Sequence, residues 1–194
     1  HAQPTAIPYL NGKIELDGKL NEGIWQQAKK FDLNLVTLPY ENTQSPVTTH
    51  AYIFDGGDTL YIGFEAQDPE IESIRANLRD RDKVWQDDLV GIILDTYGTQ
   101  KLAYHFYVNP LGVQIDSVES EVNSTESDDW DAIWYSQTHL DKTGFSAEFA
   151  IPMSSLHFNN STGEKQWALE LLRWYPRDVK YRLSHIAVDR NNGC

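Results

Sequence analysis

The sequence has 194 residues, of which 40% are hydrophobic, and a formal net charge of −13. A chain of this length is typical of one domain and can bury about 70% of its unfolded surface without a stabilising disulfide or metal. The acidic charge argues against nucleic acid and anionic membrane surfaces as partners, because binding a polyanion requires clustered Lys and Arg. The single cysteine, Cys194, excludes an internal disulfide and a zinc site built from cysteines.

The first third of the chain predicts a short helix followed by a β-hairpin. Asn21 is placed to cap a helix over 22–30, which would direct Trp25 toward the core. Alternating apolar residues then predict two strands, over 47–54 and 59–65. An Asp-Gly-Gly-Asp sequence separates them, and this is a strong signal for a hairpin turn.

The rest of the chain predicts one more short helix and then only strands. Asp68 followed by Pro69 is a helix start, and apolar residues recur at helical spacing over 71–78. The further predicted strands cover 89–94, 102–108, 112–118, 133–140, 144–151, 166–175 and 180–188. This spacing is typical of an antiparallel two-sheet β-sandwich, so we expect an all-β, jelly-roll-like fold with two short helices.

Both ends of the chain suggest a domain excised from a longer, exported protein. The sequence opens with His1 and no initiator Met, as a mature chain does after removal of a signal peptide. It ends at Cys194 without a closing element. No apolar run approaches the roughly 20 residues of a membrane helix. We therefore expect residues 1–194 to form a single secreted, periplasmic or cell-surface domain that is not embedded in the membrane.

Several short blocks resemble a known family. Residues 16–25 read LDGKLNEGIW and have the D-G-x-L-x-E-x-x-W opening of domains similar to carbohydrate-binding module family 9. Five further blocks follow in family order, at 60–64, 87–95, 104–112, 130–134 and 144–152. Together they are spread over nearly the whole chain. The closest resemblance is to the branch in which this domain precedes a large outer-membrane β-barrel region.

The resemblance implies a β-sandwich that binds carbohydrate without catalysis, and bound calcium in some members. In the sugar-binding members, two Trp rings clamp a terminal sugar. Trp85 with Asp88 matches one of the clamp positions, and Trp174 is the candidate for the second by its place in the sequence.

The residues around Trp85 are compatible with a saccharide site. The ring lies in a charged stretch, and a sugar combines an apolar C–H face with hydroxyl groups that carboxylates or guanidinium groups can bind. Together with the resemblance, which supplies Trp174, this chemistry predicts a ligand site formed by Trp85, Asp87, Asp88, Arg173 and Trp174. The alternative is that Trp85 folds back over the edge of the sandwich as a packing residue.

A second acidic region predicts a cation site. No Lys or Arg occurs from 102 to 141, and oxygen-rich segments are what Ca²⁺ requires. The spacing is not that of an EF-hand, and a set of solvated acids is the alternative. The candidate calcium ligands are Asp116, Glu126, Asp128, Asp129 and Asp131.

Two other functions stay open beside sugar binding. The domain could be a structural or interaction domain attached to an outer-membrane barrel, with no sugar site. It could also be a glycosidase if Glu148 and Glu170 were neighbours, because glycoside hydrolysis uses a pair of carboxylates. The sequence contains no nucleophile elbow, phosphate loop or metal-binding His pair, so we expect no enzymatic activity.

Overall fold

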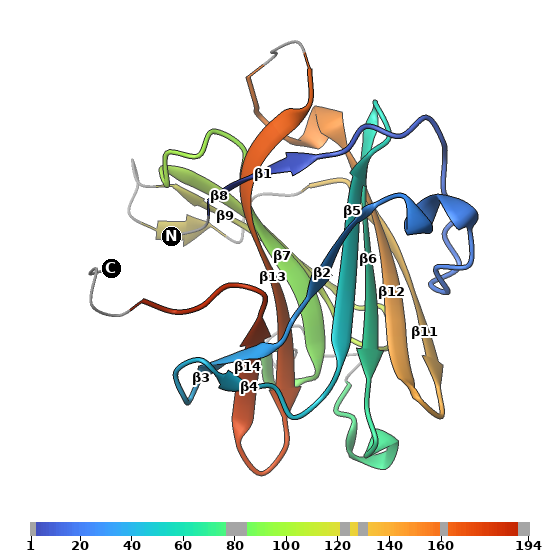
Figure 1. The fold of residues 1–194 in the computed structure, drawn as a ribbon, viewed down its shortest axis with the longest axis vertical. Coiled ribbons are helices and arrows are strands. Elements are labelled where there is room, and N and C mark those ends of the chain that lie inside the picture. Colours follow the sequence, from blue (N-terminus) through green and yellow to red (C-terminus); the bar gives the residue numbers. More distant parts are fainter. Residues whose placement is uncertain (1–2, 77–84, 121–124, 128–131, 160–162, 190–194) are drawn as a thin grey trace.

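In the computed structural model, which describes residues 3–76, 85–120, 125–127, 132–159 and 163–189, two antiparallel β-sheets pack face to face (Figure 1). This confirms the predicted all-β sandwich. Within the described ranges, no helix combines the length and the apolar character that a membrane-spanning helix needs.

The larger sheet has nine strands in the order β10-β9-β8-β7-β13-β14-β3-β4, and β1 pairs with β13. Its strands are β1 (Pro4–Ile7), β3 (Leu35–Leu38), β4 (Thr43–Gln44), β7 (Leu89–Asp95), β8 (Leu102–Val108), β9 (Gln114–Ser120), β10 (Thr125–Ser127), β13 (Lys165–Pro176) and β14 (Lys180–Ser184). The long strand β13 is central, because β7 pairs with one of its sides and β1 and β14 share the other.

The smaller sheet has five strands in the order β11-β12-β6-β5-β2. Its strands are β2 (Lys29–Asp32), β5 (Thr49–Asp55), β6 (Thr59–Gln67), β11 (Tyr135–Asp141) and β12 (Gly144–Pro152). The hairpin β5–β6 forms at the predicted turn, with Asp55 opposite Leu60.

The main core lies between the two sheets and is rich in aromatic rings. Phe64 on β6 and Phe149 on β12 have ring centroids 5.3 Å apart, and the Trp134 ring packs against both Phe149 and Phe106 of the other sheet. Burying one such side chain contributes about 1.5–3 kcal/mol. The alternation of inward and outward residues along these strands gives each sheet a second face that points away from this core.

The two predicted helices are single 3₁₀ turns. The first covers Gly23–Gln26, and the chain then continues into β2. The N-cap residue Glu22 makes no capping side-chain bond, and so short a segment gains more from pairing with β5 than from nucleating a helix. The second turn covers Ile71–Ser73, and Leu78 lies outside the described residues. A further turn covers Met153–Ser155.

Candidate functional site

The outer face of the nine-stranded sheet carries a small apolar cluster separate from the main core. Tyr107 on β8 and Leu172 on β13 lie on either side of Gly91 on β7. The Tyr107 ring lies over Gly91, since a Cβ atom there would come within 2.1 Å of its Cδ1. Leu89 and Ile115 complete the cluster. We call this surface the outer face below.

Trp85 lies at the edge of the outer face, in a short turn before β7. It is 39% exposed, which agrees with the expectation of a partly exposed ring. Its indole meets the Tyr107 ring edge-on, with centroids 5.5 Å apart and an interplanar angle of 69°. Tyr107 in turn neighbours His105, whose Nε2 lies 3.4 Å from a carboxylate oxygen of Glu119. The outer face thus presents a row of rings that ends in a polar pair.

Trp174 lies on the same outer face, as the alternation of β13 predicts, and is partly buried. Two cationic groups lie near its ring, with Lys180 Nζ 4.8 Å and Arg182 Cζ 6.0 Å from the ring centroid. The Lys180 ammonium also donates a hydrogen bond of 2.7 Å to the carbonyl oxygen of Trp85. The two predicted site tryptophans are therefore joined through Lys180.

The structure does not bring the three predicted polar partners to the surface beside these rings. Asp87 is buried and accepts a hydrogen bond of 3.2 Å from Asn109 Nδ2. Asp88 and Arg173 are both 0% exposed. Arg173 follows Leu172 on β13, and because successive side chains of a strand point to opposite faces, it points inward while Trp174 points outward. The expectation that Asp88 and Arg173 line the edge of an open sugar site is corrected accordingly.

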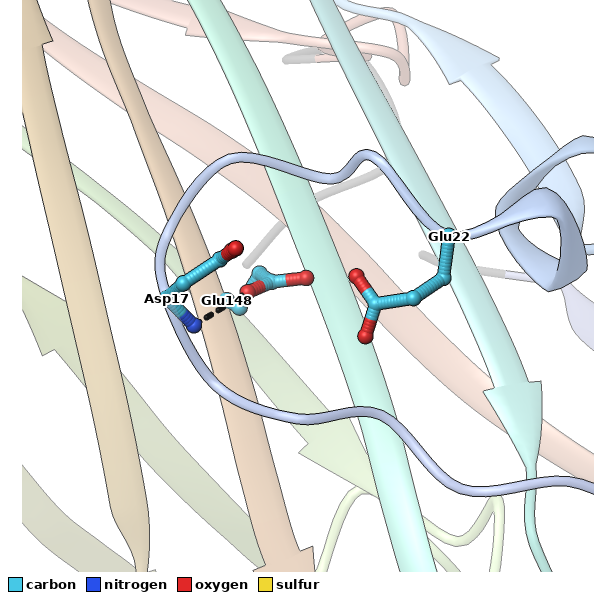
Figure 2. Close-up of side chains that lie close together, drawn as sticks. All are labelled: Asp17, Glu22 and Glu148. Atoms are coloured by element: carbon cyan, nitrogen blue, oxygen red, sulfur yellow. Dashed lines mark hydrogen bonds between the residues drawn. The ribbon is translucent and has the colours of Figure 1, made fainter.

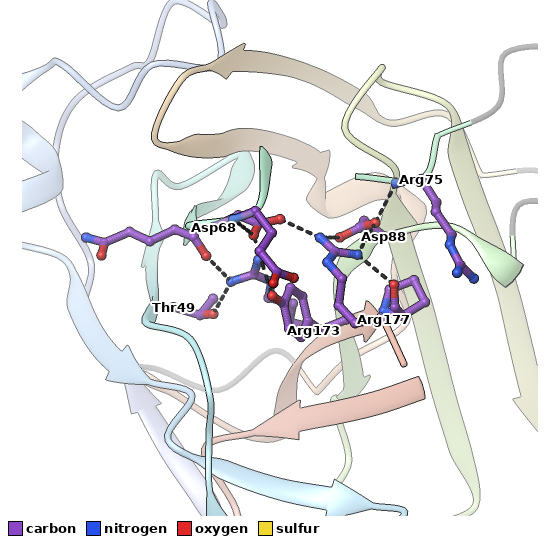
Figure 3. A network of polar contacts seen from close by, with 10 residues as sticks. Thr49, Asp68, Arg75, Asp88, Arg173 and Arg177 are labelled. Atoms are coloured by element: carbon purple, nitrogen blue, oxygen red, sulfur yellow. Dashed lines mark hydrogen bonds and ion pairs between the residues drawn. The ribbon is translucent and has the colours of Figure 1, made fainter. Parts of the chain in front are cut away.

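Asp88 and Arg173 belong to a buried polar network at one end of the sandwich (Figure 3). Arg177 donates two hydrogen bonds to Asp88, of 3.0 and 3.2 Å, and another to Asp68. Asp88 also accepts the backbone N–H of Arg75 at 2.8 Å. Burial opposes the charge of Arg177, but its bonds to the two carboxylates outweigh burial and raise its pKa. The two carboxylates are therefore the groups that hold the guanidinium of Arg177 in the interior.

Arg173 is the second arginine of this network, and it lies toward the interior of the sandwich. It donates to Thr49 Oγ1 and to the carbonyl oxygen of Gln67, both at 2.9 Å, and stacks over the Tyr175 ring at 5.0 Å. Burial lowers its pKa to about 10. Two guanidinium groups thus lie beside the two acids Asp68 and Asp88, and such pairing offsets the cost of burying charge.

A second group of acids lies on the five-stranded sheet, on the side that points away from the main core (Figure 2). Asp17, Glu22 and Glu148 each offer a carboxylate oxygen within 4.8 Å of the others. We call these residues the acid trio. Glu148 is fully buried, and one of its oxygens accepts the backbone N–H groups of Asp17 at 3.0 Å and Gly18 at 2.8 Å. Its other oxygen accepts Trp25 Nε1 at 2.9 Å.

The acid trio has the donor set of a site for a hard cation. Burial raises the pKa of Glu148, and the charge of Glu22 adds to this effect. Glu22 Oε2 accepts the backbone N–H of Glu15 at 2.9 Å, whereas its buried Oε1 has no hydrogen-bond partner among the described residues. A divalent cation would satisfy that oxygen and offset the repulsion between the carboxylates. Two acids of the trio, Asp17 and Glu22, lie in the opening block at 16–25 and could have been noticed in the sequence. The third, Glu148, lies on β12 and joins them only in the folded chain.

The predicted calcium ligands are elsewhere. Asp116 is buried on the core side of β9 and accepts Trp134 Nε1 at 2.9 Å. Glu126 lies in β10, but the placement of its side chain is outside the described part of the structure. Asp128, Asp129 and Asp131 also lie outside the described residues. A calcium site in this segment stays a prediction.

The carboxylate pair considered for glycoside hydrolysis does not assemble. Glu148 lies between the core residues Ala147 and Phe149 and so faces outward from the five-stranded sheet. Glu170 lies between Leu169 and Leu171 and faces outward from the nine-stranded sheet. The two acids therefore lie on opposite outer surfaces and cannot flank one glycosidic bond, which needs carboxyl groups within about 10 Å.

Comparisons with known proteins agree with the fold. A family model described as "Carbohydrate family 9 binding domain-like" matches residues 16–189. A search of curated proteins finds no match. Among solved structures, a protein from Bacteroides uniformis whose carbohydrate binding is itself a prediction has a TM-score of 0.71 at 15% identity, over 98% of this chain and 93% of that one.

Two further structures show a carbohydrate binding module family 9 from Caldicellulosiruptor kristjanssonii. Its complex with cellotriose has a TM-score of 0.66 at 15% identity, over 95% of this chain and 86% of that one. Its complex with glucose has a TM-score of 0.65 at 16% identity, over 95% of this chain and 87% of that one. At these identities the likeness concerns the fold.

Proposed function

This chain belongs to the carbohydrate family 9 binding domain-like family, and from that membership we propose that it binds saccharides, without catalysis, on the outer face at Trp85. The family and the complexes of the C. kristjanssonii module with cellotriose and glucose support carbohydrate as the class of ligand. Resemblance to the barrel-linked branch supports a location at the cell surface, in the periplasm or outside the cell, which fractionation of the producing cells would test.

The observation that carries the proposal is the exposed ring of Trp85 on a surface already lined with aromatic side chains. An indole that is 39% exposed offers a flat apolar face to the C–H groups of a pyranose. The neighbouring pair of His105 and Glu119, reached through Tyr107, offers groups that can bind hydroxyls. Trp174 is linked to this surface through Lys180, which lies over its ring and donates a hydrogen bond to the carbonyl oxygen of Trp85.

Replacing the exposed ring of Trp85, which we call the platform, should weaken sugar binding without destabilising the fold. Trp85→Ala is expected to reduce affinity by about 1–3 kcal/mol, the scale for removing an aromatic anchor at a binding site, which is roughly a 5- to 150-fold rise in Kd. Stability should change little, since an exposed ring leaves no closed cavity. Isothermal titration calorimetry with cellotriose and glucose measures the first quantity, and urea denaturation measures the second.

The control is an exposed ring that lies away from the outer face. Tyr135 on β11 of the other sheet is 56% exposed, so Tyr135→Ala should leave the affinity unaltered. A wild-type domain that binds nothing on a glycan array would instead favour the interaction-domain alternative. If Trp85→Ala melts far below the wild type and still binds sugar normally, Trp85 is a packing residue.

Calcium binding is a separate proposal, and the acid trio supports it better than the acidic segment around Asp116. The trio brings together three carboxylates, and one of their oxygens, the buried Glu22 Oε1, has no hydrogen-bond partner in the described part of the chain. Asp17, Glu22 and Glu148 would hold the ion, and the ion would tie the loop over 16–22 to β12. It would thus act on stability, at a distance from Trp85.

A calcium ion that binds only the folded state should raise the melting temperature by mass action. We expect a higher Tm in millimolar calcium than in excess chelator, measured by differential scanning calorimetry. Glu22→Gln should abolish the difference, whereas Glu126→Gln should preserve it. The reverse result would assign calcium to the acidic segment, and identical melting curves in both buffers would rule out a stabilising calcium ion.

A further inference from the structure

We infer that the β13–β14 hairpin positions the ring of Trp85, and we call this arrangement the hairpin clamp. It consists of two contacts: the surface grip, in which Lys180 binds Trp85, and the interior grip, in which Arg177 binds Asp88. The inference rests on the proposed function, because it concerns the same platform. The hairpin therefore contacts both ends of the segment from Trp85 to Asp88. The contact with Trp85 lies at the surface, and the contact with Asp88 lies in the interior.

The interior grip is the pairing of Arg177 with Asp88. The side chains are 7% and 0% exposed, and the guanidinium reaches both carboxylate oxygens. The backbone of Asp88 is fixed as well, because its N–H donates to the carbonyl oxygen of Arg75 at 2.9 Å. Two-point pairing of this kind restricts orientation as well as distance, so the end of the segment is held in one geometry.

The surface grip is the hydrogen bond from Lys180 to the carbonyl oxygen of Trp85. Lys180 begins β14, directly after the connection that starts at Arg177, whose N–H bonds to the carbonyl of Val179 at 3.0 Å. The same ammonium lies over the ring of Trp174 on the other arm of the hairpin. One hairpin therefore carries Trp174 and both grips, and it fixes the main chain of Trp85 relative to Trp174.

Loss of the surface grip should change the position of the Trp85 ring more than it changes the stability of the fold. Lys180 is exposed and its bond is a single one, so its loss should have a small effect on folding. The ring of Trp85 is 39% exposed, and the bond from Lys180 adds a point of attachment on its main chain to the ring contact with Tyr107. A binding group gains affinity from being held in place before the ligand arrives, since the ordering cost is then already met.

Lys180→Met removes the donor and keeps the apolar stem. We expect cellotriose affinity to fall about threefold to tenfold, the scale of ordering one flexible side chain on binding. In a Trp85→Ala background the same change should have no further effect, because no ring is left to position. If Lys180 contacted the sugar directly, it would still weaken binding in that background, and this result would overturn the inference.

The matched control is Lys165→Met at a distant ion pair. Lys165 bonds Asp55 at 2.6 Å on the β5–β6 hairpin, so its loss should leave cellotriose affinity unaltered. A readout without sugar distinguishes failure of the clamp from failure of the proposed function. In fluorine NMR of protein labelled with fluorotryptophan, Trp85→Phe identifies the Trp85 resonance. Lys180→Met should shift that resonance toward its solvent-exposed position, and an unchanged resonance would contradict the clamp even if no sugar binds.

Discussion

Glu148→Ala is expected to lower the free energy of unfolding by at least about 3 kcal/mol, although Glu148 lies outside the main core. The carboxylate is fully buried and accepts three N–H donors, from Asp17, Gly18 and Trp25. Removing it leaves these donors without that acceptor, and only the bond from the Ser146 hydroxyl to the Gly18 carbonyl then ties the loop over 16–22 to β12 among the bonds described. Each buried donor left without an acceptor costs about 1–3 kcal/mol, although these losses are not additive.

The pH dependence of this effect has a defined sign. Burial raises the pKa of Glu148, so between its unfolded and folded pKa values the folded state binds more protons than the unfolded state. The contribution of this residue is then fully present below that window and is lost as pH rises through the folded pKa. The difference in stability between the wild type and Glu148→Ala should therefore be larger at acid pH than at neutral pH, as measured by urea denaturation in chelator.

Glu65→Ala is the comparison for this variant. Glu65 lies on the adjacent strand β6, is partly buried, and accepts one hydrogen bond of 2.6 Å from the Tyr52 hydroxyl. Its loss should cost about 1 kcal/mol. Equal losses in the two variants would mean that the three donors on Glu148 find other acceptors.

The strands were predictable where one face is buried against the other sheet. β8 and β12 begin at the predicted residues, because period-two alternation survives wherever a strand is half-buried. β2 was missed, since Lys29-Lys30-Phe31-Asp32 lies at a sheet edge, where little burial forces alternation. Its formation depends on pairing with β5, and local sequence does not encode a partner strand.

The candidate site was predictable only in part. The exposure of Trp85 follows from its charged neighbours, and the outward direction of Trp174 follows from strand alternation. The burial of Asp88 could not be foreseen, because Arg177, which pairs with it, lies 89 residues away in the sequence. An acid and an arginine next to a tryptophan look like sugar-binding groups until the fold shows that they neutralise each other in the interior.

Arg177→Met is expected to have the other large effect, a loss of about 3–5 kcal/mol of stability, because removing one partner of a buried ion pair leaves an uncompensated charge. Here two carboxylates would lose their partner, since Asp68 and Asp88 are both bound to Arg177 and both have fully buried side chains. At about 2–4 °C per kcal/mol for a domain of this size, the melting temperature should fall by roughly 6–20 °C.

Arg182→Met applies the same substitution on β14 and should have a smaller effect. Arg182 pairs with Glu170 at 3.2 Å, but the two side chains are 18% and 22% exposed, and water can solvate what remains. The expected loss is about 1–2 kcal/mol, between the values for an exposed pair and for a fully buried one. Similar losses in the two variants would show that the network at Arg177 is not a desolvated one.

Acidification should partly rescue Arg177→Met. Burial already raises the pKa of Asp88, and without the guanidinium, whose bonds and charge oppose burial, it should rise further. A folded pKa above the unfolded value means that stability is lost as pH rises through the folded pKa and regained as pH falls. The free energy of unfolding of Arg177→Met, measured in urea from neutral to acid pH, should therefore approach that of the wild type on acidification. If the gap widened instead, Asp88 would be ionised and solvated in the variant, and a water-filled site would have replaced the ion pair.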